Sequence, residues 1–418
     1  MMLLRIVLKS AWHRRVGLTL TVLSLAVSMT LLLGVDKIRK GARNSFVNTV
    51  SQTDLIVGAR SGPLNLLLYS VFRIGNATNN VSWESYQDII ALDEVAWAIP
   101  ISLGDSHLGF RVMGTDANYF RHFRYGQDEP LRFNAGEPFS DLYETVVGAE
   151  VADELGYEIG DAVVISHGLV STQFGDHTDK PFRVVGILER TGTPVDRTVH
   201  VSLEGIEAIH VDWDSGARMP LHITAEQARK FDLEPQTITA FMIGLENRIE
   251  TFQLQRKINE YREEPLLAIV PGVTLAELWR SISVFEQVLT VLAGLVLAAG
   301  LVGMLTTILS TLNERRREMA VLRAVGAHPY QIILLFVLET LFVVSAGCLL
   351  GMVLLYLLLV TFHPLLVRQF GLNFALTPPD MGQWGLIALA ILLGGLVSLI
   401  PGFIAYRRSL QDGLAIKI

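Results

Sequence analysis

Four long apolar runs constrain the fold of this chain more than any other feature of its 418 residues. The runs are residues 17–35, 287–313, 332–362 and 383–406, and together they contain one charged residue, Glu339. A transmembrane α-helix needs about 20 predominantly apolar residues. We therefore predict an α-helical membrane protein with four transmembrane helices, one before and three after a mostly polar segment.

The distribution of charge predicts the orientation in the membrane. Residues 36–280 hold 22 Lys and Arg against 35 Asp and Glu, whereas 11 of the 12 remaining basic residues lie in three short segments. These segments are residues 1–16, 314–330 and 407–418. Basic residues in short loops mark the cytoplasmic side of a membrane. We expect both termini on the cytoplasmic side of the membrane and the large acidic domain outside it.

The first apolar run has an alternative interpretation as a cleaved signal peptide, because basic residues precede it. The run is longer than the roughly 7–15 apolar residues of such a peptide. No clear small-x-small cleavage site follows it. We therefore favour a retained membrane helix.

The polar segment, residues 36–280, has a mixed α/β pattern with a helix-like stretch at each end. We predict that these two stretches form stalk helices that extend outward from the membrane, although the residues alone allow ordinary loop helices equally well. Near those ends helix-like and strand-like stretches alternate, whereas residues 139–203 are richer in strand-like stretches. We predict an α+β extracytoplasmic domain in which a βαβ-rich part, made from both ends of the segment, carries an inserted β-rich part.

Two local features of the sequence add detail to this prediction. In VSWESYQDIIAL, Trp83, Tyr86 and Ile90 recur at helical spacing, and Ser82 is placed to cap the N-terminus of the helix. The only cysteine of the chain, Cys348, lies in the third apolar run. The external domain therefore has no intrachain disulfide and must be stabilised by its own core.

Motifs of catalysis are missing from the sequence. It contains no G-x-x-x-x-G-K-[ST] phosphate loop, no G-x-S-x-G elbow and no H-E-x-x-H helix. We predict no catalytic residues. The loop HGLVSTQFGDHTDK offers side chains of metal-binding types at His167, Asp176, His177 and Asp179. A solvated polar loop is the simpler interpretation, and we predict no metal site.

The basic loop between the second and third runs, residues 314–330, favours a helix. Met319, Leu322 and Val325 form an apolar stripe, and Gly326 can end the helix. The neighbouring arginines can extend toward lipid headgroups. From the residues alone, a basic helix on the membrane surface and a helix that docks into a cytoplasmic partner are equally good interpretations.

The chain resembles the MacB/FtsX-type ABC transporter permease family, which includes the lipoprotein-extracting LolC and LolE proteins. The similarity rests on the one-plus-three helix layout and on ERRREMAVLRAVGA after the second run. It also rests on the external segments VVGAEVADELGYEIGDAVVI and FRVVGILERTG and on the ending PGFIAYRRSLQDGLAIKI. It covers essentially the whole chain.

The resemblance implies a permease subunit that pairs with a second copy or with a homologous permease and binds a separate cytoplasmic ABC ATPase. ATP and Mg²⁺ would bind to that ATPase, and this chain would hold no cofactor. ATP binding would move the cytoplasmic ends, and the helices would relay the movement to the external domain for efflux or lipoprotein export. The residues implied in ATPase coupling are Glu314, Arg315, Arg316, Arg317, Glu318, Met319, Leu322, Arg323 and Gly326.

Other functions stay open at this stage. An FtsX-like regulatory scaffold would use the same layout to activate a periplasmic hydrolase, although the external domain here is larger than in that branch. A membrane receptor would need a cytoplasmic output domain. A periplasmic adaptor or a lipoprotein is an additional candidate partner. The acidic charge of the external domain disfavours a polyanionic cargo, and we expect no nucleic-acid partner.

The third apolar run contains one acidic residue and a pair of glycines. Glu339 is an acid at membrane depth, which is by default a functional candidate. The simpler interpretation, which we favour, places it near the cytoplasmic interface beside an arginine. Gly347 and Gly351 form a G-x-x-x-G pair, which permits close helix packing and hints at a dimer face.

Overall fold

The computed structural model describes residues 15–47, 49–167, 177–214, 217–218, 223–312, 319, 321, 326–370 and 378–411. The chain divides into two compact units. We call Met1–Ala42 together with Ile282–Ile418 the helical unit, and Arg43–Ser281 the sheet unit.

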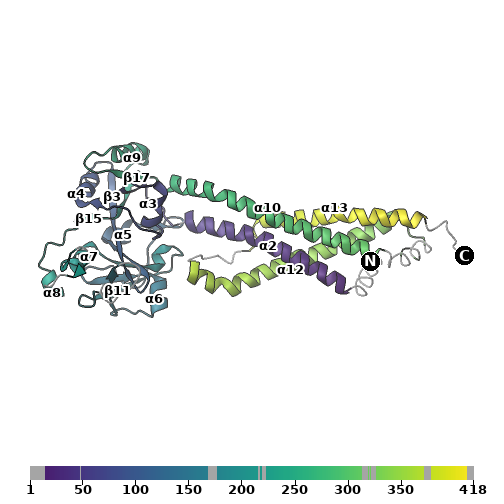
Figure 1. Ribbon diagram of the computed structural model, residues 1–418, viewed down its shortest axis with the longest axis horizontal. Helices are drawn as coiled ribbons and strands as arrows, with labels where there is room; N and C mark the ends of the chain where they lie inside the picture. Colours follow the sequence, from purple (N-terminus) through teal and green to yellow (C-terminus); the bar gives the residue numbers. More distant parts are fainter. Residues whose placement is uncertain are drawn as a thin grey trace. The chain divides into compact units, whose positions relative to one another are not determined.

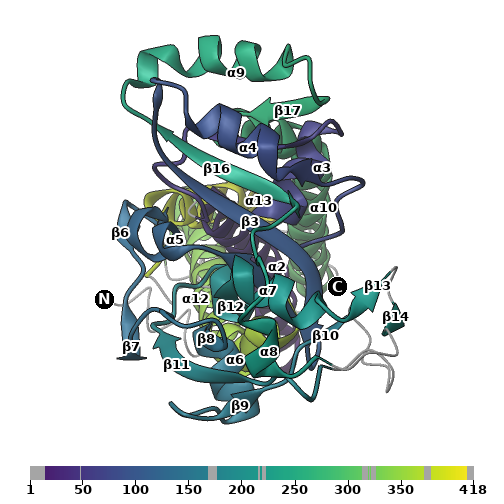
Figure 2. The same ribbon diagram turned by 90° about the vertical axis from the view of Figure 1, so that its left-hand side faces the viewer.

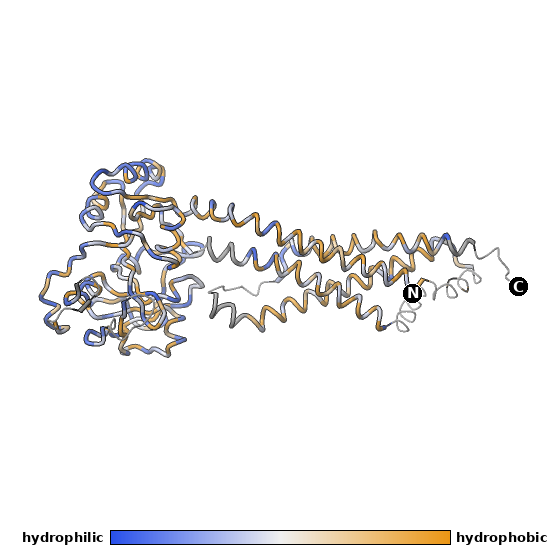
Figure 3. The backbone as a smooth tube through the Cα atoms, in the orientation of Figure 1, coloured by the Kyte–Doolittle hydropathy of each residue, from blue (hydrophilic) through white to orange (hydrophobic). Residues whose placement is uncertain are grey.

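The described part of the helical unit consists mainly of four long helices (Figure 1). They are α2 (Arg15–Val47), α10 (Pro271–Thr311), α12 (Pro329–Phe370) and α13 (Met381–Gln411). Each contains a stretch that is long and apolar enough to cross a membrane, with a mean hydropathy between 2.2 and 2.6. Figure 3 shows hydrophobic residues along all four helices. The prediction of four transmembrane helices is confirmed.

Aliphatic side chains from all four helices form the core of the helical unit. Leu25 and Met29 of α2 pack with Leu297 of α10, Val344 of α12 and Ala390 of α13. On other faces of these helices many large apolar side chains are exposed. Exposed aliphatic side chains along a helix of this length suit contact with lipid acyl chains.

The sheet unit contains a mixed sheet whose described part has eleven strands. Nine of them follow the order β17-β1-β16-β3-β4-β12-β8-β11-β7, while β10 pairs with β3 and β9 pairs with β11. Neighbours are antiparallel except β4–β12 and β8–β11. The bounds are β1 Leu55–Ala59, β3 Val95–His107, β4 Phe110–Thr115, β7 Phe133–Gly136, β8 Glu144–Val147, β9 Ala162–Val163, β10 Ser166–His167, β11 Phe182–Leu188, β12 Thr198–Ser202, β16 Ala240–Leu245 and β17 Leu266–Ile269.

The 13-residue strand β3 joins the two halves of this sheet. Its first part, up to Ile101, pairs with β16, and its second part, from Ser102, pairs with β4. Strands from both ends of the unit (β1, β16 and β17) therefore form one half. Strands from the middle of the unit form the other half, which includes β8 to β12 of the region predicted to be β-rich. Short two-stranded pairs complete the unit: β2 (Val81–Ser82) with β15 (Thr237–Ile238), β5 (Arg124–Tyr125) with β6 (Glu129–Pro130), and β13 (Trp213–Asp214) with β14 (Ala217–Arg218).

Helices cover both faces of the sheet, because apolar side chains that alternate along a strand point to opposite faces. Ile56 of β1 packs with α3 and α5 on one face, whereas Leu55 and Val57 pack with α4 and α9 on the other. Over the second half, α6, α7 and α8 lie on the face opposite α5 (Figure 2). The helices are α3 Pro63–Ser70, α4 Trp83–Ile90, α5 Ala117–His122, α6 Ala149–Leu155, α7 Leu203–His210, α8 Ala225–Ala228 and α9 Thr251–Asn259, with 3₁₀ turns η1 Pro194–Arg197 and η2 Arg248–Glu250.

Side-chain caps explain where several of these helices begin. The Ser82 hydroxyl oxygen accepts a hydrogen bond of 3.2 Å from the backbone N–H of Ser85 at the start of α4, as predicted. Asp116 and Ser202 cap α5 and α7 in the same way. The prediction of a helical membrane part with an α+β domain is confirmed.

Candidate functional site

Within the predicted coupling segment, residues 314–330, the structure describes Met319, Val321 and residues 326–330. Met319 is helical and only 5% exposed, and it packs with Leu312, Ile332, Phe336 and Ala405. Val321, two residues further on, is helical and 62% exposed. Met319 therefore contacts the helical unit itself, whereas Val321 points away from it. The remaining predicted coupling residues lie outside the described part of the chain: Glu314, Arg315, Arg316, Arg317, Glu318, Leu322 and Arg323.

The turn from this segment into α12 is built from local sequence features. Gly326 has a φ of 96°, a left-handed conformation that favours glycine. The backbone N–H of His328 donates a 2.9 Å hydrogen bond to Oε1 of Gln331, and Pro329 occupies the first position of the helix. The predicted end of a helix at Gly326 has the backbone conformation that such an end requires.

Glu339 lies on a buried side of α12. It is 4% exposed, and its neighbour Thr340 is fully buried. Phe336, three residues earlier and thus on the same side of the helix, belongs to the cluster around Met319. The carboxyl group therefore faces protein near the coupling segment, as acids at membrane depth usually do. Its pairing with an arginine remains a prediction.

Gly347 and Gly351 face α2 of the same chain. A Cβ at Gly347 would lie 2.8 Å from Cβ of Leu25, and one at Gly351 would lie 2.7 Å from the carbonyl oxygen of Ala26. The Thr30 hydroxyl donates to the carbonyl oxygen of Gly351 at 2.9 Å. The glycine pair thus lets two helices of one chain approach closely, and its packing partner in the structure is α2.

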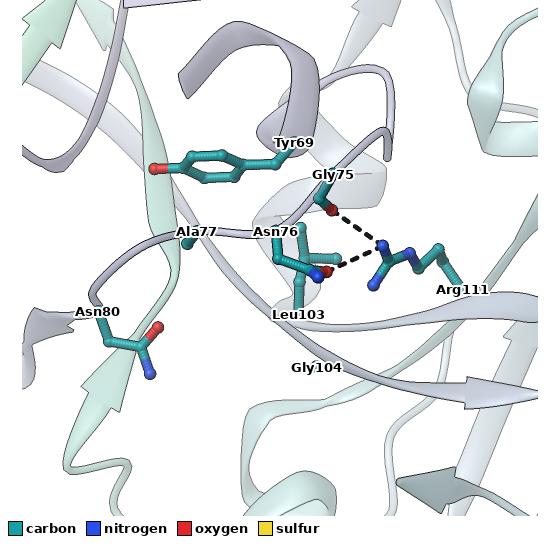
Figure 4. A pocket seen from close by; sticks show the side chains of 8 residues that line it. All are labelled: Tyr69, Gly75, Asn76, Ala77, Asn80, Leu103, Gly104 and Arg111. Carbon is teal, nitrogen blue, oxygen red and sulfur yellow. Dashed lines mark hydrogen bonds between the residues drawn. The ribbon is translucent and has the colours of Figure 1, made fainter. Parts of the chain in front are cut away.

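The sheet unit contains a cavity of about 480 Å³ near the end of α3 (Figure 4). Its lining residues are Tyr69, Gly75, Asn76, Ala77, Asn80, Leu103, Gly104 and Arg111. The guanidinium of Arg111 donates to the carbonyl oxygen of Gly75 at 2.9 Å and to Oδ1 of Asn76 at 3.0 Å. Burial raises the pKa of Tyr69 to about 12, so its hydroxyl stays protonated at neutral pH. With one cation and no carboxylate or imidazole, this lining can bind a small polar or anionic group but offers no general base.

The histidines on either side of the loop, His167 and His177, do not have the environment that we predicted for this loop. We expected a solvated polar loop, but His177 is 1% exposed. His167 and His177 lie together with His210, the last residue of α7. Asp179 is not part of this group, and Asp176 lies outside the described residues. The sequence carries no signal that could have linked His210 to the loop, because they are far apart along the chain.

Two family models match the chain. The MacB-like periplasmic core domain matches residues 18–261, which is more than half of the chain, and the FtsX-like permease C-terminal domain matches residues 290–413. The chain belongs to the MacB/FtsX-type ABC transporter permease family. The permease thus has an extracytoplasmic domain, the sheet unit, and a set of membrane helices.

Two curated relatives are about a quarter identical to the permease over the residues that they match. It is 24% identical over 297 residues to the pyoverdine export ATP-binding/permease protein PvdT of Pseudomonas savastanoi pv. phaseolicola; the match covers 64% of this chain and 40% of PvdT. It is 24% identical over 305 residues to the uncharacterized ABC transporter permease MJ1507 of Methanocaldococcus jannaschii, covering 68% and 71% of the two chains. The permease therefore spans less than half the length of PvdT.

Solved structures of external domains are similar to the permease at low sequence identity. The match to the periplasmic region of MacB from Actinobacillus actinomycetemcomitans covers 56% of this chain and 95% of the MacB chain, at 8% identity and a TM-score of 0.35. The match to the extracellular domain of the transporter YknZ from Gram-positive bacteria covers 52% of this chain and 99% of the YknZ chain, at 11% identity and a TM-score of 0.31. Neither score supports an inference about function.

Proposed function

We propose that the permease binds a separate cytoplasmic ATPase through residues 314–327 and converts ATP hydrolysis there into conformational work of the sheet unit. Both termini and the coupling segment lie on the cytoplasmic side of the bacterial inner membrane, and a second permease, identical or homologous, completes the transporter. The work serves export of a hydrophobic or lipid-modified substrate that is handled outside the membrane. ATP and Mg²⁺ bind to the ATPase.

The apolar interior of the helical unit carries this proposal. Among the described residues of the four membrane-spanning stretches, Glu339 is the only buried carboxylate or basic side chain. The packed core is aliphatic. A route for a polar substrate through the bilayer would need polar or charged side chains along it. An apolar core instead suits helices that transmit movement and let nothing pass between them.

The length of the helices supports transmission of movement. The first apolar run ends at residue 35, but α2 continues to Val47, which adds about 18 Å of helix at 1.5 Å per residue. Helix α10 likewise begins at Pro271, well before its apolar run at residue 287. A continuous helix carries a displacement along its axis, because each turn is hydrogen-bonded to the next.

Met319 and Val321 have different roles within this segment. Met319 is buried against the helical unit and anchors the segment, so that a force on the segment reaches α12 and α13 through Phe336 and Ala405. Val321 is exposed and lies on the side that an ATPase groove would contact. Partner binding by an amphipathic helix in a groove is a common mode of recognition.

The test is affinity purification of the permease in mild detergent, with mass spectrometry of the proteins that it retains. We expect the wild type to retain an ABC ATPase and Val321→Asp to lose it. Ile249→Asp is the matched control, because Ile249 is an exposed aliphatic residue of the sheet unit. It should retain the ATPase. Equal recovery of the ATPase with all variants would refute docking through this segment, and a retained hydrolase without an ATPase would favour the scaffold function.

A further inference from the structure

Three histidines from separate segments meet in the second half of the sheet unit. They are His167 in β10, His177 after the loop and His210 at the end of α7, and each places one ring nitrogen within 4.8 Å of the others. The rings of His167 and His210 are stacked with centroids 4.5 Å apart, and His177 lies edge-on to both.

The strand register explains why one of these rings is held in place. β10 pairs with β3 in a register that sets His167 directly opposite Asp105. Residues directly opposite on antiparallel strands lie on the same face of the sheet. Nδ1 of His167 is 3.1 Å from Oδ1 of the buried Asp105. This contact orients the ring and leaves its other nitrogen, Nε2, to face the group.

Four ring nitrogens of the group make no hydrogen bond within the described part of the protein, although Nε2 of His210 lies 3.8 Å from Oδ1 of Asp105. Nε2 of His167, Nε2 of His210 and both ring nitrogens of His177 are buried without a hydrogen bond to any described residue. The ring of His210 is also hydrogen-bonded to the backbone of Ile206. Leaving a buried polar atom without a partner costs about 1–3 kcal/mol. One nitrogen from each ring, three atoms in all, could be satisfied by a single ligand that binds them together.

The neutral imidazole is the form that binds a metal. The adjacent buried ammonium of Lys180 forms an ion pair with Asp212, which offsets the positive charge that it brings near the rings.

We propose that His167, His177 and His210 form a binding site for a divalent transition-metal ion of the Zn²⁺ class in the extracytoplasmic domain. Imidazole is a preferred ligand of Zn²⁺, Cu²⁺ and Ni²⁺. At Zn–N bonds of about 2.0–2.1 Å, ligand nitrogens in a tetrahedral complex lie about 3.3 Å apart. The stacked rings of His167 and His210 must therefore rotate for all three nitrogens to reach one ion. Asp105 is a positioning residue that orients His167, a role that carboxylates often have behind metal-bound histidines.

The site would connect three segments that the Lys180–Asp212 ion pair and the packing of Trp213 already bring together. A bound ion joins β10, the residues that follow the loop, and α7. Trp213 packs edge-on against His167 and tilted against His177, with ring centroids 4.6 and 4.8 Å away, and shields one side from water. Three protein ligands leave the fourth position of a tetrahedral ion to water. This half of the external domain would then respond to the metal concentration outside the membrane.

The test is metal binding by the full-length permease, purified in detergent through a tag without histidine and stripped with a chelator. Zn²⁺ is titrated in competition with a chromophoric chelator, and Co²⁺ reports coordination geometry by its visible absorption. We expect one Zn²⁺ per chain and the spectrum of tetrahedral Co²⁺. His177→Ala and His210→Ala should abolish both signals, and Asp105→Asn should weaken Zn²⁺ binding by about 10- to 100-fold.

A matched control separates this site from adventitious binding, because the chain contains 10 histidines. His328→Ala removes an exposed histidine of the helical unit and should leave the affinity unchanged. Asp105→Asn keeps all three imidazoles and decides the question if the histidine variants fail to fold. The proposal is overturned if the wild type binds no Zn²⁺, or if folded variants bind it as the wild type does. ATPase docking has no part in this assay, so its failure would leave the result intact.

Discussion

Gly351→Ala should destabilise the helical unit, although the change adds only one methyl group. The new Cβ would lie 2.7 Å from the carbonyl oxygen of Ala26 and 2.9 Å from Cβ of Met29. The first of these atoms is backbone and cannot turn aside, so α2 and α12 must separate. Separation also stretches the 2.9 Å hydrogen bond from Thr30 to the carbonyl oxygen of Gly351.

The size of the effect follows from three contributions. Overpacking of a close-packed site costs about 1–3 kcal/mol. Hydrogen bonds between membrane helices contribute about 0.6 kcal/mol on average. Alanine favours a helix over glycine by up to about 1 kcal/mol, which acts in the opposite direction. The net loss is about 1–3 kcal/mol, which corresponds to about a 5- to 150-fold increase in the population of opened states.

The only cysteine of the chain provides the assay. Cys348 lies on α12 beside the glycine pair and is 4% exposed. It should therefore react with a maleimide only when the packing opens. We expect the labelling rate of the full chain in detergent to rise about 5- to 150-fold in Gly351→Ala. The thiol and its helix are the same in both proteins, so the ratio of rates reports the opening equilibrium.

Gly303→Ala is the matched control for this experiment. Gly303 lies in the membrane-spanning stretch of α10, and a Cβ there would meet nothing within 4 Å. The control gains the same helix propensity without the clash, so its labelling rate should stay equal to that of the wild type or fall. If Gly351→Ala and Gly303→Ala label at the same rate, close packing of α2 on α12 through the glycine pair is refuted.

Two further predictions concern the sheet unit. Burial, followed by the charge of Arg73, lowers the pKa of His200 to about 3, below the value of about 6.5 in an unfolded chain. The unfolded state therefore takes up a proton that the folded state excludes, so stability should fall by about 1.4 kcal/mol per pH unit as the pH drops from about 6.5 toward 3. Hydrogen exchange of β12 should show this dependence, and His200→Gln should flatten it; an unchanged slope would contradict the assignment. Ser82→Ala removes the cap of α4 and should cost about 1 kcal/mol, visible as faster exchange at the start of α4 but not of α7, which has its own cap.

The sequence alone determined the features that depend on neighbouring residues. Membrane helices follow from the length of apolar runs, because no distant partner is needed to make such a run insert. The beginning of α4 followed from Ser82 and the spacing of the residues after it, since a cap bonds within one turn. The family also followed from contiguous segments. These features are local, and the order of residues carries all the information that they need.

Only the tertiary structure decided which of the distant residues meet. The glycine pair predicted close helix packing, but the sequence of α12 does not show that its packing partner is α2 of the same chain. The loop with His167 and His177 had the pattern of a solvated segment, but the register of β10 on β3 and the position of α7 set these two histidines beside His210, with His177 buried. Sheet register and helix packing depend on contacts between residues far apart in sequence, which a local pattern does not encode.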